Sequence, residues 1–481
     1  MARKGGSRHG RLRFVRPRYP ERTATASPRP PYHWVVTFTA RSRPTPPTGL
    51  LWLPFFVAAL GFVFNQFQIL AAPLVLRPVL QTLGGLQPGS SGFNTWSGIL
   101  IFVPAAVGGL FGLGGGYLSD LLGRRRLLVM AIVTYGVASL GAALSTSVMM
   151  FLLMRCVAWA GVCVEFVAAI AWVAELYPDP TRREHVLGYS QSFIGLGGLL
   201  VSGVYYLAAT WAHHLPELGG GHEAWRYTLL VGTVPAVAIL LLRPFMPESP
   251  VWLNRRASGP LARPPVGDLF SSGLLRTTMV STLLVACAYA LPYGATQHTP
   301  RIVPGLPSLR GAPSLVVEQT VSLVQMAQEV GGFLGRVLLS IVVVSAVTRR
   351  RLLTMFLIPT VCATAWLYFG SGASGLLSMM LGVALLSLLF NAQMSFWGNY
   401  LPRVFPTRIR ATGEGFAMNI GGRILGTSAA MMTTQLATVM PGTSAPLQLA
   451  YAAGAVALTA CAGSLALSPL LREPDGLELP A

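Results

Sequence analysis

The 481-residue chain is 53% hydrophobic and only 11% charged, with a mean hydropathy of +0.57. This composition excludes an ordinary soluble surface and indicates an integral protein of the lipid bilayer. The net charge of +19 does not indicate a nucleic-acid partner, because much of it lies in residues 1–49. The five cysteines all lie in apolar segments, so we expect no disulfide framework, no metal site and no cofactor.

The chain begins with a basic segment, residues 1–49, in which eleven arginine and lysine side chains face a single acidic residue, Glu21. Its composition predicts a disordered cytoplasmic tail. It could be a transit peptide, a basic arm that binds lipid headgroups, or a solvated extension without a function, and we favour the last interpretation.

About twelve apolar runs follow, each close to the roughly 20 residues that a helix needs to cross a bilayer. They lie near residues 51–75, 94–118, 126–147, 149–175, 187–210, 226–245, 273–293, 317–346, 351–370, 374–398, 412–438 and 446–470. The sequence therefore predicts an all-α membrane protein with twelve transmembrane helices.

Arginines divide the connecting loops into two groups. Most of them fall on one side together with the N-terminal tail, and the other side has few: Arg77, Arg226, Arg301 and Arg310. The positive-inside rule then predicts that both termini are cytoplasmic in a multi-pass protein of the bacterial inner (plasma) membrane.

A polar, proline-bearing linker at residues 254–272 divides the apolar part of the chain into two halves of similar length. We expect a six-helix bundle at 50–253 and a second at 273–471, with a short cytoplasmic tail at 472–481. The turn after the eighth helix, Arg349–Arg351, is a degenerate copy of the turn after the second. Two pseudo-symmetric bundles around a central cavity are typical of transporters.

The turn after the second helix carries Gly116, Asp120 and Gly123, followed by the basic run Arg124–Arg126. Glycines at every fourth position of that helix predict close contact with a neighbouring helix: Gly108, Gly112 and Gly116. Asp120 could face the N-terminus of another helix, where partial positive charge favours an anion. The arginines could instead serve only to set the topology.

Ionisable residues inside a bilayer cost about 2.5–3.5 kcal/mol on insertion scales, so each needs a partner or a water-lined cavity. The predicted fourth helix carries Arg155 and Glu165, and the first helix carries the amides Asn65 and Gln68 at mid-depth. An amide can bind a solute but cannot carry a proton. We therefore predict Asn65, Gln68 and Arg155 as solute-binding residues and Glu165 as the proton carrier.

In the second half, Gln325 and Glu329 lie on one predicted helix, and Asn391 and Trp397 lie on another that is polar and aromatic. We predict all four as solute-binding residues, since they suit a ring-bearing or hydroxylated solute. Trp397 could instead be an interfacial anchor, and Asn391 a helix-to-helix hydrogen bond. Two further arginines, Arg336 and Arg423, lie nearer the cytoplasmic side. They could line the cavity, or they could form structural ion pairs with residues of neighbouring helices.

Four motifs in order resemble those of the major facilitator superfamily, and the resemblance covers about residues 50–472. They are Gly116–Arg126; Arg155 with Glu175–Pro178 and Arg182; Pro247–Leu253; and Pro406–Gly413 with Asn419–Arg423. The closest likeness is to its sugar and metabolite proton symporters, including aromatic-acid and organic-anion porters. The resemblance implies a cytoplasmic gate of Gly116, Asp120, Gly123, Arg124, Glu175 and Arg182, in which Glu175 pairs with Arg182, and this gate stabilises an outward-open state. It also implies a carboxylate in the first helix, which this chain lacks.

These observations predict a monomeric secondary transporter that moves a small organic solute by alternating access. An organic anion, an aromatic acid or a sugar-like metabolite is expected, with protons as a second partner. The alternatives are an efflux transporter of the same fold and a membrane sensor or scaffold. An enzyme is not expected, because no nucleotide loop, zinc signature or serine–histidine–acid set is present in the sequence.

Overall fold

The computed structural model describes residues 52–177, 179–257, 266–342, 348–370, 375–406 and 409–473. Within these ranges the secondary structure is helical, apart from one isolated bridge between Leu218 and Gly221. The expected basic tail and the C-terminal tail beyond Glu473 lie outside the described residues, as does the central part of the expected linker.

The first half of the chain begins with four long helices and continues with shorter ones. They are α1 (Trp52–Gly84), α2 (Ser91–Leu122), α3 (Arg124–Ala143), α4 (Val148–Leu176), α5 (Pro180–Ser192), α6 (Ile194–Trp211), α7 (Ala224–Val231), α8 (Val234–Leu242) and α9 (Pro250–Ala257). α1 runs well past its expected end at residue 75 although it contains Pro73 and Pro78. Prolines are tolerated in such helices because neighbouring segments satisfy the freed backbone groups.

The second half contains five long helices, α10, α12, α13, α14 and α17, and one crossing that is interrupted. Its helices are α10 (Leu275–Gly294), α11 (Thr299–Ile302), α12 (Ser314–Val342), α13 (Arg349–Phe369), α14 (Leu376–Tyr400), α15 (Arg410–Phe416), α16 (Ala429–Leu436) and α17 (Ala445–Leu467). Between α15 and α16 the chain forms a π-helical segment, η10 (Ala417–Gly426). π-helical turns are rare and are frequent at functional sites.

Ten helical segments of the described residues are long and apolar enough to cross a membrane. The other two expected crossings, 317–346 and 412–438, correspond to α12 and to the run from α15 to α16. α12 carries several charged and amide side chains, and the second run is broken by η10. The all-helical class is as predicted, while the count of twelve crossings stays a prediction.

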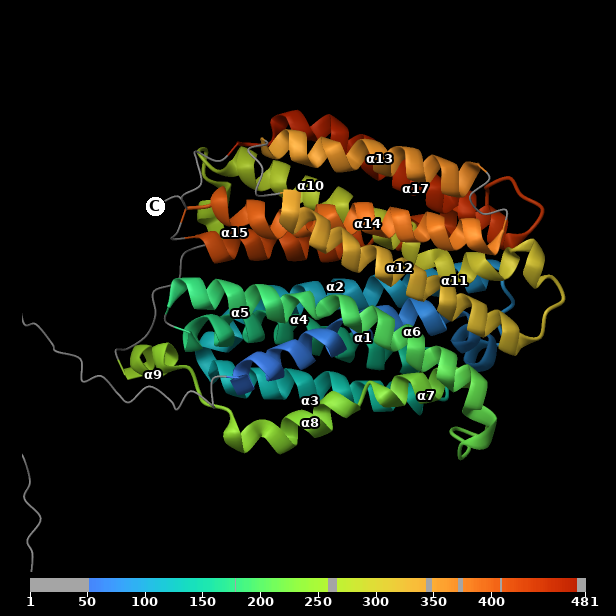
Figure 1. Ribbon diagram of the computed structural model, residues 1–481, viewed down its shortest axis with the longest axis horizontal. Helices are drawn as coiled ribbons and strands as arrows, with labels where there is room; N and C mark the ends of the chain where they lie inside the picture. Colours follow the sequence, from blue (N-terminus) through green and yellow to red (C-terminus); the bar gives the residue numbers. More distant parts are fainter. Residues whose placement is uncertain are drawn as a thin grey trace, which may run out of the picture. The chain divides into compact units, whose positions relative to one another are not determined.

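The helices of each half pack chiefly on one another: α4 contacts α2 and α3, and α12 contacts α14. Figure 1 shows the blue and green helices of the first half beside the yellow and red helices of the second. The halves also contact each other, through α6 with α12 and through α2 with η10 and α16. The helices α5, α9 and α15 lie at one end of the two bundles, where the arginine-bearing turns are found (Figure 1). We call this end the arginine-rich end.

Candidate functional site

The four residues predicted in the first half meet between α1 and α4, and we call them the first-half cluster: Asn65, Gln68, Arg155 and Glu165. All four are buried. Asn65 Nδ2 donates to the Val162 carbonyl at 2.8 Å and to the Glu165 carboxylate. Arg155 donates to the side-chain oxygen of Gln68 at 3.2 Å and to the Gln68 carbonyl. Arg155 and Glu165 of α4 therefore each face an amide of α1.

Neither charge of the first-half cluster has a counter-charge among the described residues. No described carboxylate lies within 4.0 Å of the Arg155 guanidinium, and no described basic group lies that close to Glu165. The Arg155 Nε and the Glu165 Oε1 are buried and make no hydrogen bond within the described part of the chain. The absence of a side chain at Gly61 makes room for the Glu165 carboxylate, since a Cβ at Gly61 would lie 2.5 Å from Oε1.

A second polar group lies on α12, where Gln325 Nε2 donates to Glu329 Oε1 at 3.0 Å. Glu329 packs across the boundary between the halves against Gly198 of α6, where a Cβ would lie 2.1 Å from Oε2. Asn391 of α14 donates to the Ser387 carbonyl at 3.0 Å and packs beside Gly332 of α12. Gln325, Glu329 and Asn391 are all buried, so the α12–α14 contact brings the predicted residues of the second half near one another.

Trp397 lies apart from these groups, and Arg336 lies farther along α12 than Glu329. The Trp397 ring is buried at the end of α14, with centroids 5.0 Å from Phe396 and 5.8 Å from Tyr400. Tyr400 in turn donates to the carbonyl of Arg472 at 2.9 Å, so this aromatic group belongs to the arginine-rich end. Arg336 makes no ion pair with Glu329 within 4.0 Å in the described region; it packs beside Gly195 of α6.

At the arginine-rich end, Arg124 is buried and pairs with two carboxylates. Its guanidinium lies 2.7 Å from Asp120 Oδ1 and 2.9 Å from Glu175. Ser249 donates to Glu175 Oε2, and the Trp252 indole donates to the Asp120 carbonyl at 2.7 Å. α2, α3, α4 and α9 are thereby joined, and we call this set of contacts the first-half latch.

Gly123 fixes the turn in the first-half latch. Its φ of +96° lies in the left-handed region, which ends α2 and starts α3. A Cβ there would also lie 2.7 Å from Glu248 Oε2, and Glu248 accepts from the Arg125 N–H at 3.1 Å. Gly116 has open space around its Cβ position, so the structure gives it no packing role in the gate.

The expected pairing of Glu175 with Arg182 is not found among the described residues. Glu175 is held by Arg124, which starts α3 directly beside it. Arg182 lies in α5, with its guanidinium 5.8 Å from the Tyr177 ring centroid and its N–H donating to Asp179 at 3.0 Å. Arg124 therefore takes the position that the sequence motif suggested for Arg182.

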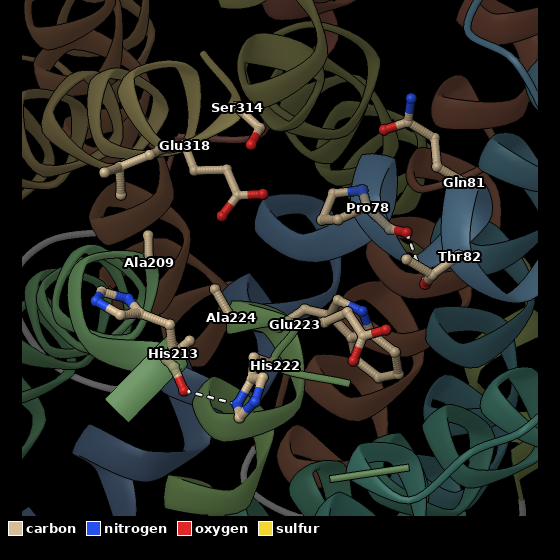
Figure 2. Close-up of a pocket in the computed structure, with 13 residues that line it drawn as sticks. Pro78, Gln81, Thr82, Ala209, His213, His222, Glu223, Ala224, Ser314 and Glu318 are labelled. Atoms are coloured by element: carbon tan, nitrogen blue, oxygen red, sulfur yellow. Dashed lines mark hydrogen bonds between the residues drawn. The ribbon is translucent and has the colours of Figure 1, made fainter. Parts of the chain in front are cut away.

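The halves are also joined at the end opposite the arginine-rich end. Gln319 of α12 donates to Thr210 of α6 at 3.0 Å, and Gln435 of α16 donates to Thr95 of α2 at 3.4 Å. A cavity of about 310 Å³ lies at this end between α1, α6, α7 and α12. Figure 2 shows its polar lining, including His213, His222 and Glu223 of the first half and Ser314 and Glu318 of the second. Within the described ranges, no group of three metal-ligating side chains occurs.

Comparison with known proteins gives the family. Residues 55–431 match the Major Facilitator Superfamily. The chain belongs to this superfamily. A Bacillus subtilis member named NiaP is 27% identical over 369 residues, which is 76% of this chain and 84% of that protein. The niacin transporter NiaP of Acinetobacter baylyi is 25% identical over 424 residues, or 82% and 88% of the two chains.

A crystal structure of the D-xylose-proton symporter has a TM-score of 0.68 to this chain at 19% identity, and covers 89% of this chain and 100% of the symporter. At that identity the likeness shows the fold alone, which is the major facilitator fold. The predicted family and fold are confirmed, and so is the prediction of a secondary transporter of a small solute.

One residue of this superfamily member was not predicted from the sequence: Glu473, the second-half counterpart of Glu248. Glu473 accepts from the backbone N–H groups of Arg349 and Arg350, at 3.0 and 2.9 Å, at the start of α13. Glu248 does the same at the start of α3. The signal was present in the sequence, since each glutamate follows the last apolar run of its half and precedes a serine–proline or a proline.

Proposed function

We propose that this superfamily member carries a small carboxylate-bearing solute, an organic anion or aromatic acid, and that protons drive its movement. The sugar-like metabolite that the sequence also suggested is less well matched by the charges. The niacin relative supports this choice, because niacin is a pyridine carboxylic acid.

The observation that carries the proposal is the environment of Arg155. A buried guanidinium whose described partners are all neutral is costly inside a membrane. A solute carboxylate would supply the missing negative charge through charge-assisted hydrogen bonds. Gln68 accepts hydrogen bonds from the two terminal nitrogens of Arg155. The Arg155 Nε is a donor with no described acceptor.

Glu165 is the proposed proton carrier. Its only described side-chain donor is the amide of Asn65, which can serve the ionised and the protonated carboxyl group, and no described cation stabilises the ionised form. The carboxyl group can therefore gain and lose a proton as the site exchanges with water on either side. Arg155 and Glu165 bind to different amides of α1, so solute and proton would be sensed by the same helix.

Movement of the two halves would then expose the site to each side in turn. The Thr210–Gln319 and Thr95–Gln435 contacts are the ones that must separate to open the end opposite the arginine-rich end. The first-half latch would act as the gate at the arginine-rich end, with Arg124, Asp120 and Glu175 as its charged members. We propose that this end faces the cytoplasm, that the protein acts as a monomer in the bacterial inner membrane, and that it performs no chemical conversion.

The test is uptake of labelled nicotinate into proteoliposomes with an acidic exterior, against empty liposomes. We expect accumulation that collapses when the pH gradient is removed. Glu165→Gln should abolish accumulation but keep exchange of internal for external nicotinate, whereas Glu217→Gln, an exposed loop change, should alter neither. Accumulation by Glu165→Gln equal to that of the wild type would overturn proton coupling through this residue.

A further inference from the structure

An aromatic group with an arginine lies at mid-depth on the boundary between the two halves, apart from the residues assigned above. Its members are Trp159 of α4, Tyr289 and Tyr293 of α10, and Arg423 of η10. Each lies near the middle of its crossing segment. Three helical segments therefore bring ring faces and a positive charge to one level of the membrane.

The rings are held in defined orientations. Tyr289 and Tyr293 lie parallel, with an interplanar angle of 7° and centroids 6.1 Å apart. Trp159 reaches across from the first half, with its centroid 6.5 Å from that of Tyr293. Gly422 and Gly426 of η10 admit Tyr289, since a Cβ at either position would lie within 2.8 Å of it. The tyrosine rings are thus fixed against η10, and Trp159 meets them from the other bundle.

Arg423 lies in the π-helical segment and faces the first half. It donates to Asn419 Oδ1 at 2.7 Å, and its Nη1 lies 3.3 Å from the Cβ position of Gly112 in α2. No described carboxylate lies within 4.0 Å of its guanidinium. Gly109 and Gly112 provide the room for this approach, so two glycines of α2 serve to admit a cation from the other half.

We propose that these four residues form a recognition site for an aromatic carboxylate. The face of the solute ring would pack on Tyr293 and Trp159, and its carboxylate would bind Arg423 here and Arg155 of the first-half cluster at another stage of its passage. Aromatic pairs contribute to binding beyond the burial of area, and a guanidinium binds a carboxylate through two parallel hydrogen bonds. Because Trp159 belongs to one bundle and the other three residues to the second, a bound ring contacts both halves at once.

This inference rests on the proposed function but is more specific, since that function needs only a carboxylate. It also uses residues of its own: Trp159, Tyr289, Tyr293 and Arg423 are distinct from the first-half cluster. Packing alone would account for the rings but not for an arginine at mid-depth beside them whose described hydrogen bond goes to a neutral amide.

The experiment measures binding of benzoate and of cyclohexanecarboxylate to the purified full-length protein by calorimetry. The two acids have the same charge and similar size, but only benzoate has a π face. We expect the wild type to bind benzoate about tenfold more tightly, in keeping with one or two ring contacts. Tyr293→Leu and Trp159→Leu should each remove most of this preference while leaving cyclohexanecarboxylate affinity within about twofold.

Arg423→Gln should weaken both acids by about tenfold or more, as expected for loss of a charged partner. Matched controls are Tyr451→Leu, which removes a ring stacked on Phe369 elsewhere in the second half, and the exposed Arg276→Gln. Equal wild-type affinity for the two acids would overturn the inference and leave the proposed function standing. Failure of the wild type to bind either acid would overturn both.

Discussion

Two of the regions of the first half that hold buried charges provide partners for them in different ways. In the first-half latch, Arg124 pairs directly with two carboxylates, Asp120 and Glu175. In the first-half cluster, Arg155 and Glu165 face only amides among the described residues. The same helix, α4, supplies Glu175 to the first region and Arg155 and Glu165 to the second.

The difference indicates which charges can bind a ligand without losing an ion pair. A charge that already has an oppositely charged partner loses that partner when it binds a ligand, so the latch favours holding helices together. A charge whose partner is an amide can accept a ligand of opposite charge without breaking an ion pair. We therefore propose that the latch serves conformational control and that the cluster binds the solute and the proton.

The largest effect is expected when Arg155 is given an internal counter-charge, because this change removes the difference between the cluster and the latch. Gln68→Glu would convert the amide contact into an ion pair like those of the latch. We expect nicotinate uptake to fall about 100-fold, which corresponds to about 2.7 kcal/mol, because the solute carboxylate must now compete with a tethered one. The measurement is initial uptake into proteoliposomes at fixed pH gradient.

The control for this change is Gln87→Glu, which adds the same charge at an exposed turn and should leave uptake unchanged. Uptake by Gln68→Glu near the wild-type rate would mean that Arg155 is not available to the solute. In that case the cluster would be as structural as the latch.

The next largest effect is expected in the latch itself. Glu175→Gln removes a largely buried carboxylate that holds Arg124 and accepts from Ser249. We expect the free energy of unfolding to fall by about 2 kcal/mol, within the range for a hydrogen bond to a charged group, while the affinity for nicotinate changes little. Denaturation in SDS and calorimetric binding measure the two quantities, and a large loss of affinity with unchanged stability would contradict the division of roles.

A smaller effect is expected for the other latch carboxylate. The Asp120 side chain is 43% exposed, so solvent screens its pairing with Arg124. Asp120→Asn should lower the free energy of unfolding by only about 0.5 kcal/mol. If Asp120→Asn lowers the free energy of unfolding as much as Glu175→Gln does, the two carboxylates contribute equally to stability. Their different exposure to solvent would then not determine their contributions.

Much of the fold follows from the sequence, because each crossing helix must be about 20 apolar residues long and arginines mark the turns at one end. Departures occur where tertiary contacts extend or interrupt a helix. α1 continues through Pro73 and Pro78 because its later residues, including Val79 and Leu80, are buried. The π-helical segment η10 carries several glycines, but a glycine pattern does not predict how the backbone is wound.

The candidate site was only partly predictable. Intramembrane cost identifies Arg155 and Glu165 as residues that need partners, and the structure supplies Gln68 and Asn65, which the sequence had also singled out. Spacing along one helix cannot say which neighbour a side chain meets, so Glu175 was matched to Arg182 and not to Arg124. Tyr289 and Tyr293 gave no signal, because tyrosines in an apolar helix are equally typical of packing.

Direct binding of nicotinate to the purified protein tests the central claim, that Arg155 receives the solute carboxylate. We expect measurable affinity for the wild type, the same affinity for Arg276→Gln, and a loss of about 100-fold or more for Arg155→Gln. If Arg155→Gln binds nicotinate as tightly as the wild type, Arg155 does not bind the solute.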